Sequence, residues 1–415
     1  MWELGEKTGS YLIFAEHRYF GESVPEASST PPSCLRYLTT EQATADYATL
    51  ISSLRKKWND VDNEIKFIGF GGSYGGMLGS WMRMRYPDAL DGMIAGSAPI
   101  LSFQGLNPPY DPNTYDKLVT RDAGGLDSWC VKNLKSAWKE ITEYSSSVSG
   151  RELLSRSFKT CVPLDSEAEA LELISWVQAP MGYMAMGDYP FASDYMTHGD
   201  GKPMVAYPFK VACSHLSTPS MKGSALLRGV AGFASVYYNR TNVNAKCLFN
   251  GDSTSSRRRR TKPMTRAERD GAPSNGCAGT WDYMYCTEMV QPFASGTGQD
   301  LFYPASPWNV TQVAAGCLAS WGVTTRPDWA TIGFPGSRLD NGRFSNIVFT
   351  NGALDPWSGG GVTRNISHAD DLVAFVLKNG AHHLDFMWSH PNDPPDAIAA
   401  RAFISSYIHK WTVLN

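Results

Sequence analysis

Short apolar runs recur near both ends of the chain. They lie at residues 11–15, 66–70, 92–100, 346–351 and 372–377. Runs of this length that are apolar throughout are typical of parallel strands buried on both faces. Patterns of helical period accompany them, at residues 39–54, 77–84 and 395–411. This alternation predicts an α/β fold in which helices cover both faces of a parallel sheet.

The middle of the chain has a different pattern. From about residue 101 to 335 the apolar period is mainly helical, as at residues 129–144, 166–176 and 226–238. Seven of the eight cysteines lie in this region. We therefore expect residues 101–335 to form a helical, disulfide-stapled domain, inserted between the two parts of the sheet domain at residues 1–100 and 336–415.

One stretch carries a specific chemical signal. Residues 71–75 read Gly-Gly-Ser-Tyr-Gly, which fits the Gly-x-Ser-x-Gly nucleophile elbow, and they lie between a predicted strand and a predicted helix. Small residues two positions before and after the serine allow the strained backbone that exposes its hydroxyl. We predict that Ser73 is the nucleophile and that the backbone N–H of Tyr74 stabilises the oxyanion. A glycine-rich turn that only packs a strand on a helix is the alternative.

An acid and a base follow in the order that a hydrolase triad requires. Asp355 comes after the run at 346–351, and the pair His382 and His383 comes after the run at 372–377. A serine needs an imidazole to accept its proton and a carboxylate to hold that imidazole. These residues predict a Ser-Asp-His hydrolase, and they leave the choice between the two histidines open. Alternatives with a poorer placement are Asp370, Asp371, Asp385, His17, His368 and His390.

The composition argues against several classes of function. Lys and Arg number 37 against 40 Asp and Glu, a formal net charge of −3, which argues against a nucleic-acid partner. No stretch approaches the roughly 18 apolar residues of a membrane span. The cysteines lack the close pairs of a zinc site, so we expect disulfides and no metal. The cysteines, together with glycosylation sequons at Asn239, Asn309 and Asn365, indicate a secreted or lysosomal compartment.

The chain resembles the lysosomal Pro-X carboxypeptidase and dipeptidyl peptidase II family of serine exopeptidases. The segments that carry the resemblance span nearly the whole chain, at residues 16–23, 71–78, 187–193, 286–288, 351–361 and 380–385. The resemblance implies an α/β-hydrolase interrupted by a helical cap, without a cofactor, that cleaves after a penultimate proline or alanine. It selects His382 as the base. It also implies peptide substrates with a proline near one end, and it allows a homodimer.

The resemblance also implies parts of the substrate site. Met77 and Trp357 match positions of a proline pocket, and Trp281 is a weaker match; all three could instead be core residues. Asp282 resembles the acid that binds the free amino terminus in dipeptidyl peptidase II. Met387 stands where Pro-X carboxypeptidase has an arginine. The last two positions favour release of dipeptides from the amino terminus over removal of one residue from the carboxyl terminus.

The family's cysteine pattern implies three disulfides. They would join Cys130 to Cys213, Cys161 to Cys247, and Cys286 to Cys317. Cys34 and Cys277 are left over, and the sequence does not establish whether they pair.

The region before the nucleophile is short for this fold. Only the run at residues 11–15 precedes the nucleophile strand, whereas the family's sheet has three further strands and a loop that donates the second oxyanion N–H. Residues 1–10 are also too polar for a signal peptide. We therefore expect the chain to be an N-terminally incomplete version of a secreted enzyme. The two other hypotheses are an esterase or lipase on the same fold, and a binding protein whose catalysis is impaired.

Overall fold

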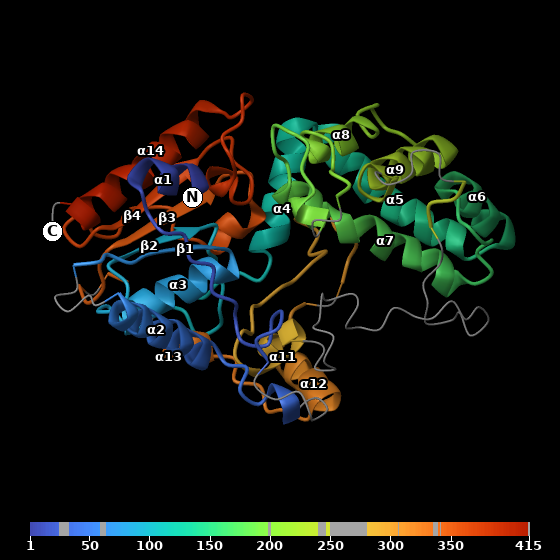
Figure 1. Cartoon of the computed structure of the whole chain (residues 1–415). Coiled ribbons are helices and arrows are strands. Elements are labelled where there is room, and N and C mark those ends of the chain that lie inside the picture. Colours follow the sequence, from blue (N-terminus) through green and yellow to red (C-terminus); the bar gives the residue numbers. More distant parts are fainter. Residues whose placement is uncertain are drawn as a thin grey trace.

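The structure is a computed structural model. It describes residues 1–24, 33–58, 64–197, 201–239, 246–249, 280–305, 307–334, 339–340 and 342–413. In these residues a parallel four-stranded sheet lies beside a group of helices (Figure 1). The strand order is β1-β2-β3-β4, and the strands are β1 (Ile68–Gly72), β2 (Gly92–Gly96), β3 (Ile347–Gly352) and β4 (Leu372–Leu377). The predicted parallel α/β sheet is confirmed.

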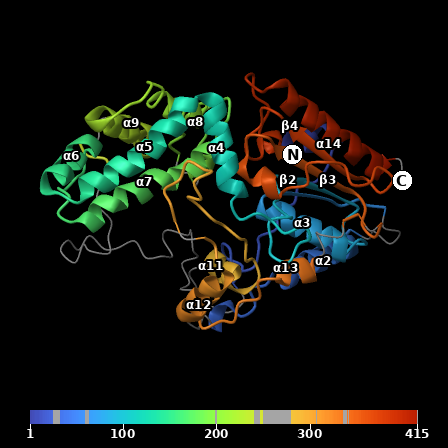
Figure 2. The ribbon, with the colours of Figure 1, turned by 180° about the vertical axis from the view of Figure 1, so that it is seen from behind.

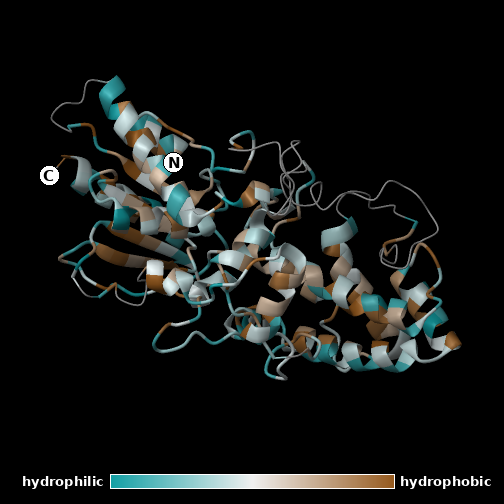
Figure 3. Ribbon diagram, turned by 90° about the horizontal axis from the view of Figure 1, so that it is seen from below, coloured by the Kyte–Doolittle hydropathy of each residue, from teal (hydrophilic) through white to brown (hydrophobic). Residues whose placement is uncertain are grey.

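Helices cover both faces of the sheet (Figures 1 and 2). On one face lie α1 (Trp2–Thr8) and α14 (Pro395–Val413), and on the other lie α2 (Thr40–Lys57), α3 (Tyr74–Arg85) and α13 (Trp329–Gly333). Successive strand residues point to opposite faces, so each strand serves two cores. Val348 packs with Trp411 of α14, whereas Phe349 belongs to the core that contains Trp81 of α3. Figure 3 shows the strands as mostly hydrophobic, as a sheet buried on both faces requires.

A bundle of helices lies at one side of the sheet (Figures 1 and 2). Its members are α4 (Thr114–Leu126), α5 (Ser128–Ser145), α6 (Val148–Phe158), α7 (Glu167–Met186), α8 (Pro208–Ser214) and α9 (Gly223–Tyr238). Their apolar faces share a core that includes Leu134, Leu173 and Phe233. We call residues 114–238 the cap. The same core continues into the sheet domain through Leu377, Leu384 and Ala400, so the cap packs directly against that domain.

Two of the predicted disulfides staple the cap. Cys130 is bonded to Cys213 and joins α5 to α8, and Cys161 is bonded to Cys247. The third joins Cys286 of α11 (Thr280–Thr287) to Cys317 of α12 (Val310–Trp321). All three predicted pairs are confirmed. Cys34 is also disulfide-bonded, and Cys277 lies outside the described residues.

Helices α11 and α12 belong with the sheet domain rather than with the cap bundle. Met284 and Trp321 pack in the same core as Trp81 of α3. Just after α11, Glu288 accepts a hydrogen bond from the hydroxyl of Thr40, the first residue of α2, at 2.6 Å. The segment 101–335 thus contributes to both bodies, and its proposed role as one inserted domain applies best to residues 114–238.

The remaining helical turns are short and lie in connections. They are η1 (Ser33–Leu35), η2 (Tyr195–Thr197), η5 (Pro356–Gly360) and η6 (Leu384–Phe386). None of the helices in the described part of the chain is long and apolar enough to cross a membrane.

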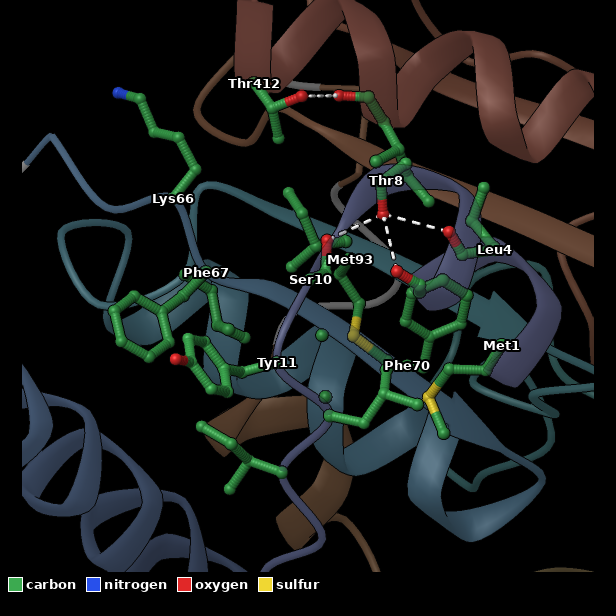
Figure 4. Close-up of a pocket in the computed structure, with 18 of the residues that line it drawn as sticks. Met1, Leu4, Thr8, Ser10, Tyr11, Lys66, Phe67, Phe70, Met93 and Thr412 are labelled. Carbon is green, nitrogen blue, oxygen red and sulfur yellow. Dashed lines mark hydrogen bonds between the residues drawn. The ribbon is translucent and has the colours of Figure 1, made fainter.

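The predicted strand at residues 11–15 is wrong. Among the described residues the segment has no strand partner, and its side chains include the exposed Tyr11, by 86%, and Phe14, by 63%. Residues of this segment and of β1, which is an edge strand of the described sheet, line a cavity of about 1430 Å³. Figure 4 shows Tyr11 from this segment and Phe67 and Phe70 from the region of β1 around the cavity. An apolar run becomes a strand only when a neighbour accepts its backbone hydrogen bonds, and residues 11–15 pair with none of the four strands of the described sheet.

Candidate active site

Ser73 stands at a strained bend between β1 and α3. Its backbone has φ 54° and ψ −123°, and its N–H donates to the carbonyl oxygen of Gly96 at 2.9 Å. A positive φ is rare for residues other than glycine and is typical of strained functional positions. A Cβ atom at Gly71 would collide with the backbone of Gly75, so the glycine two positions before the serine is required. Strand, bend and helix together have the geometry of the nucleophile elbow of α/β-hydrolases.

The sequence motif predicts that the residue two positions after the serine, Gly75, must be small, and the structure differs. A Cβ atom at Gly75 would meet nothing within 4 Å, whereas one at Gly76 would lie 2.8 Å from the Cβ of Ala98. The close approach of α3 to the segment after β2 therefore depends on Gly76. The motif's second glycine is not required by space in this chain.

Asp355 and His382 form a buried pair. Asp355 Oδ2 lies 2.7 Å from His382 Nδ1, and both residues are almost inaccessible to solvent. The other carboxylate oxygen accepts a hydrogen bond from the backbone N–H of Trp357 at 3.0 Å. With Nδ1 bonded to the carboxylate, Nε2 of His382 is the ring nitrogen left for proton transfer.

Ser73 adjoins the histidine pair without a hydrogen bond to it. In the part of the chain that the structure describes, Ser73 Oγ has no hydrogen-bond partner. The rings of His382 and His383 lie 3.7 Å apart, and Nε2 of His383 would be 2.7 Å from a Cβ atom placed on Gly72. The pair therefore lies against the elbow. In unliganded enzymes the hydrogen bond between nucleophile and base is often long and tightens with substrate.

The geometry distinguishes the two histidines. His382 bonds to Asp355, whereas His383 has φ 61° and its Nδ1 lies 3.0 Å from the hydroxyl of Tyr195. Burial, and then the charge of His382, lower the pKa of His383 well below its usual value. His383 therefore stays neutral, and His382 has the contacts of a base.

The alternative acids and histidines have other partners. Asp370 bonds to Ser367, Asp371 to Lys410, Asp385 to Thr350, His17 to Tyr74, His368 to Asn365 and His390 to Asn392. None of these contacts involves the imidazole of His382. Asp355 is therefore the acid that the geometry favours.

Tyr74 begins α3, so its backbone N–H is among those without a partner inside the helix. Its hydroxyl lies 3.0 Å from Nε2 of His17, and burial raises the pKa of Tyr74 well above its usual value. The ring of Trp281 meets the ring of Tyr74 edge-on, with centroids 5.3 Å apart. These contacts fix the residue whose N–H is the predicted oxyanion donor.

The predicted substrate residues differ in their surroundings. Met77 is buried in the core beneath α3, and its N–H donates to the carbonyl oxygen of Ser73 at 3.0 Å. Trp357 is half-buried beside Asp355, and its ring meets those of Tyr115 and Phe293 at centroid distances of 5.0 and 5.5 Å. These rings give an aromatic surface close to the acid.

The other two predicted substrate residues lie on α11. Trp281 is 41% exposed and contacts Tyr74, and Asp282 is half-buried next to it. The structure thus brings Trp281 to the elbow through Tyr74 and Trp357 to the acid. Met77 is placed in the core.

The cap contains residues that contact the histidines and that the sequence pattern did not predict. The N–H of His382 donates to the carbonyl oxygen of Met186 at 3.0 Å, and the hydroxyl of Tyr189 donates to the carbonyl oxygen of His382 at 2.6 Å. Tyr189 lies in the segment 187–193, which carried only the family resemblance. Its Gly-Asp-Tyr-Pro sequence was the one available signal, and nothing local in it indicates a histidine partner.

Comparisons with known proteins find relatives that match nearly the whole chain. The family model described as serine carboxypeptidase S28 matches residues 1–404. The chain is 37% identical over 413 residues to the lysosomal Pro-X carboxypeptidases of Pongo abelii and Homo sapiens, covering 99% of this chain and 76% of each relative. It is 32% identical over 424 residues to prolyl carboxy peptidase like protein 5 of Caenorhabditis elegans, covering 99% of this chain and 78% of that relative. The chain therefore belongs to the serine carboxypeptidase S28 family and is a serine peptidase with an α/β-hydrolase fold.

Proposed function

We propose that this serine peptidase cleaves peptides after a penultimate proline or alanine, with Ser73, Asp355 and His382 as the catalytic triad. The observation that carries the proposal is the 2.7 Å contact between Asp355 Oδ2 and His382 Nδ1, beside a serine with φ 54° at the elbow. A buried carboxylate that fixes one imidazole nitrogen leaves the other available to activate the serine.

The proposed reaction proceeds through an acyl-enzyme. Ser73 Oγ attacks the carbonyl carbon of the scissile bond while Nε2 of His382 takes the hydroxyl proton. The backbone N–H of Tyr74 donates to the oxyanion, and the start of α3 adds partial positive charge there. His382 then passes the proton to the leaving amine. A water molecule, activated by the same imidazole, releases the acyl group.

We propose that the aromatic surface around Trp357 accepts the proline ring. Trp357 follows Asp355 by two residues, and its indole N–H donates to the thioether of Met186 at 3.1 Å. A rigid pyrrolidine stacks well on an indole ring. Trp281 would bound the opposite side through Tyr74, and Met77 would support the elbow from below.

Release of dipeptides from the amino terminus is the form that the charged groups favour. Asp282, beside Trp281, offers a carboxylate to a substrate ammonium group. On the histidine side Met387 is uncharged, and the nearby Arg401 is engaged by Asp393 and by the carbonyl oxygens of Leu384 and Asp385. Removal of one carboxyl-terminal residue is the second candidate, and it is favoured by the names of the relatives, which are Pro-X carboxypeptidases.

The names of the relatives support a proposal for the compartment. The relatives are named as lysosomal, and three disulfides link described cysteines. Asn309 and Asn365 of two sequons are exposed; the third sequon, at Asn239, continues outside the described residues. We propose a lysosomal or secreted glycoprotein.

Three substrates test the proposal. They are a chromogenic Xaa-Pro anilide with a free amino group, an N-blocked peptide ending in Pro-Phe, and a short-chain ester, each assayed with wild type and Ser73→Ala. Dipeptide release that disappears in Ser73→Ala supports the first form. Cleavage of the blocked peptide alone supports the carboxypeptidase, and turnover of the ester alone supports an esterase. Absence of turnover with all three supports a binding protein.

A further inference from the structure

We propose that Tyr189 and Tyr195 of the cap are positioning residues that hold the histidine loop, residues 381–384, against the elbow. The inference rests on the proposed role of His382 as the base. In this arrangement the cap holds the base in place.

Both backbone polar groups of His382 are held by the cap. Its N–H donates to the carbonyl oxygen of Met186, the last residue of α7, at 3.0 Å, and its carbonyl oxygen accepts from the hydroxyl of Tyr189 at 2.6 Å. The imidazole then has the Asp355 carboxylate on Nδ1. Three hydrogen bonds thus fix the base, and two of them come from a segment almost 200 residues away in the sequence.

The second histidine is held by the cap on its side chain and by the sheet domain on its backbone. Nδ1 of His383 lies 3.0 Å from the hydroxyl of Tyr195, and the backbone N–H of His383 donates to Ser97 Oγ at 3.2 Å. Because the rings of the two histidines lie 3.7 Å apart, a shift of His383 would displace His382 as well. His383 also has φ 61°, a conformation that persists only where surrounding contacts maintain it.

Tyr189 is itself rigidly mounted. Its side chain is fully buried, its carbonyl oxygen accepts from the N–H of Tyr207 at 2.8 Å, and its ring stacks with that of Phe191. The preceding carboxylate, of Asp188, accepts from the N–H of Phe209 at 2.9 Å. The segment 186–195 is therefore tied to α8, which the disulfide at Cys213 joins to α5. A hydroxyl group fixed in this way can define the position of the base.

Removal of a hydrogen bond changes which positions of the histidine loop are favourable. A buried carbonyl without a donor is costly, so removal of the Tyr189 hydroxyl favours movement of the loop toward another donor. A displacement of the base of about 1 Å is enough to lower the rate on the order of a hundredfold. Substrate affinity depends on other groups and stays nearly constant. Loss of positioning therefore lowers kcat and leaves KM close to its original value.

The test compares three tyrosine variants of the full chain, each changed to phenylalanine. Tyr189→Phe removes the hydrogen bond to His382, and Tyr195→Phe removes the contact with His383. Tyr238→Phe is the matched control, because that hydroxyl also donates to a backbone carbonyl inside the cap, that of Trp176, at 3.0 Å. The measurements are kcat and KM on the substrate turned over by wild type, the rate at which a fluorophosphonate labels Ser73, and the melting temperature.

We expect Tyr189→Phe to lower kcat and the labelling rate by about ten- to a hundredfold with KM within about twofold of wild type. Tyr195→Phe has the same signature at about three- to tenfold, and it serves as the test if Tyr189→Phe does not fold. Tyr238→Phe leaves kcat and the labelling rate unchanged. In a His382→Ala background, Tyr189→Phe has no further effect on the labelling rate, because the tyrosine acts through that histidine.

The proposal is overturned if Tyr189→Phe keeps kcat within twofold, raises KM instead, or slows labelling further in the His382→Ala background. A loss of kcat in Tyr238→Phe equal to that in Tyr189→Phe also overturns it, since the effect is then general to the cap. A different result would show that the proposed triad itself is wrong. In that case the single variant His382→Ala keeps nearly wild-type activity.

Discussion

Nε2 of His383 lies 2.7 Å from the position that a Cβ atom would take at Gly72. The residue before the nucleophile is variable in the elbow motif, yet here it packs directly against the histidine loop. The His383 ring cannot easily retreat, because it lies 3.7 Å from the ring of His382 and its Nδ1 contacts Tyr195. Glycine at position 72 is thus a condition for the placement of the histidine pair.

Gly72→Ala tests this relationship. The added methyl group pushes His383 away from the elbow, and we expect kcat to fall by about tenfold or more. Overpacking of this kind lowers the free energy of unfolding by about 1–3 kcal/mol. Steady-state kinetics and urea denaturation measure the two effects. Gly125→Ala in α4 is the control, because a Cβ atom there meets nothing within 4 Å. Wild-type kcat in Gly72→Ala would contradict the proposed placement.

Asp355→Asn tests the acid. The amide keeps the shape of the side chain but cannot hold His382 in the tautomer that accepts the serine proton, so we expect kcat to fall by about 10⁴-fold. The measurement is kcat with the melting temperature alongside. Asp370→Asn, which changes an acid that bonds to Ser367, is the control. If the two variants lose activity equally, Asp355 is not the acid of a triad.

Trp357→Leu tests the proline pocket. Loss of the aromatic surface removes stacking worth about 0.5–1.5 kcal/mol, so kcat/KM on a proline substrate falls by about three- to tenfold. The matching alanine substrate, which cannot stack, keeps its kcat/KM. The ratio of the two values is the measurement. Trp388→Leu, at an exposed tryptophan stacked on Trp2, leaves the ratio unchanged. An equal loss on both substrates would place the proline elsewhere.

Asp188 gives the fold a pH dependence. Burial raises the pKa of Asp188 to about 6, and the charge of Asp122, whose own pKa burial raises to about 6, adds to the effect. The folded chain therefore binds this proton more tightly than the unfolded chain. The resulting stability, at most about 3 kcal/mol, is present below about pH 4 and is lost as the pH rises to about 6.

Asp188→Asn removes this contribution, since the amide does not ionise and still accepts from the N–H of Phe209. We expect the variant to match wild type in urea unfolding at pH 4 and to exceed it in stability at pH 7.5. Asp165→Asn, at an exposed residue, is the control and shows no such divergence. Parallel stability curves for Asp188→Asn and wild type would show that the buried carboxyl does not titrate in this range.

Much of the fold could be predicted from the sequence because its signals are local. The apolar run Leu372–Leu377 predicted its strand without error, and the glycines around Ser73 predicted a strained bend between a strand and a helix. The family resemblance gave the three disulfide pairs. Local periodicity failed at residues 11–15, because a strand depends on a partner that the run itself does not contain.

The candidate site divides in the same way. Sequence order alone predicted Ser73, Asp355 and a histidine pair as the candidates, since each follows a strand and parallel strands place their carboxyl ends at one edge. The tertiary structure decided which histidine meets Asp355, because the positive φ of His383 turns its side chain toward Tyr195 and Gly72. It also decided that Met186 and Tyr189 hold His382. Such contacts join residues far apart in the chain, and no local pattern of side chains encodes them.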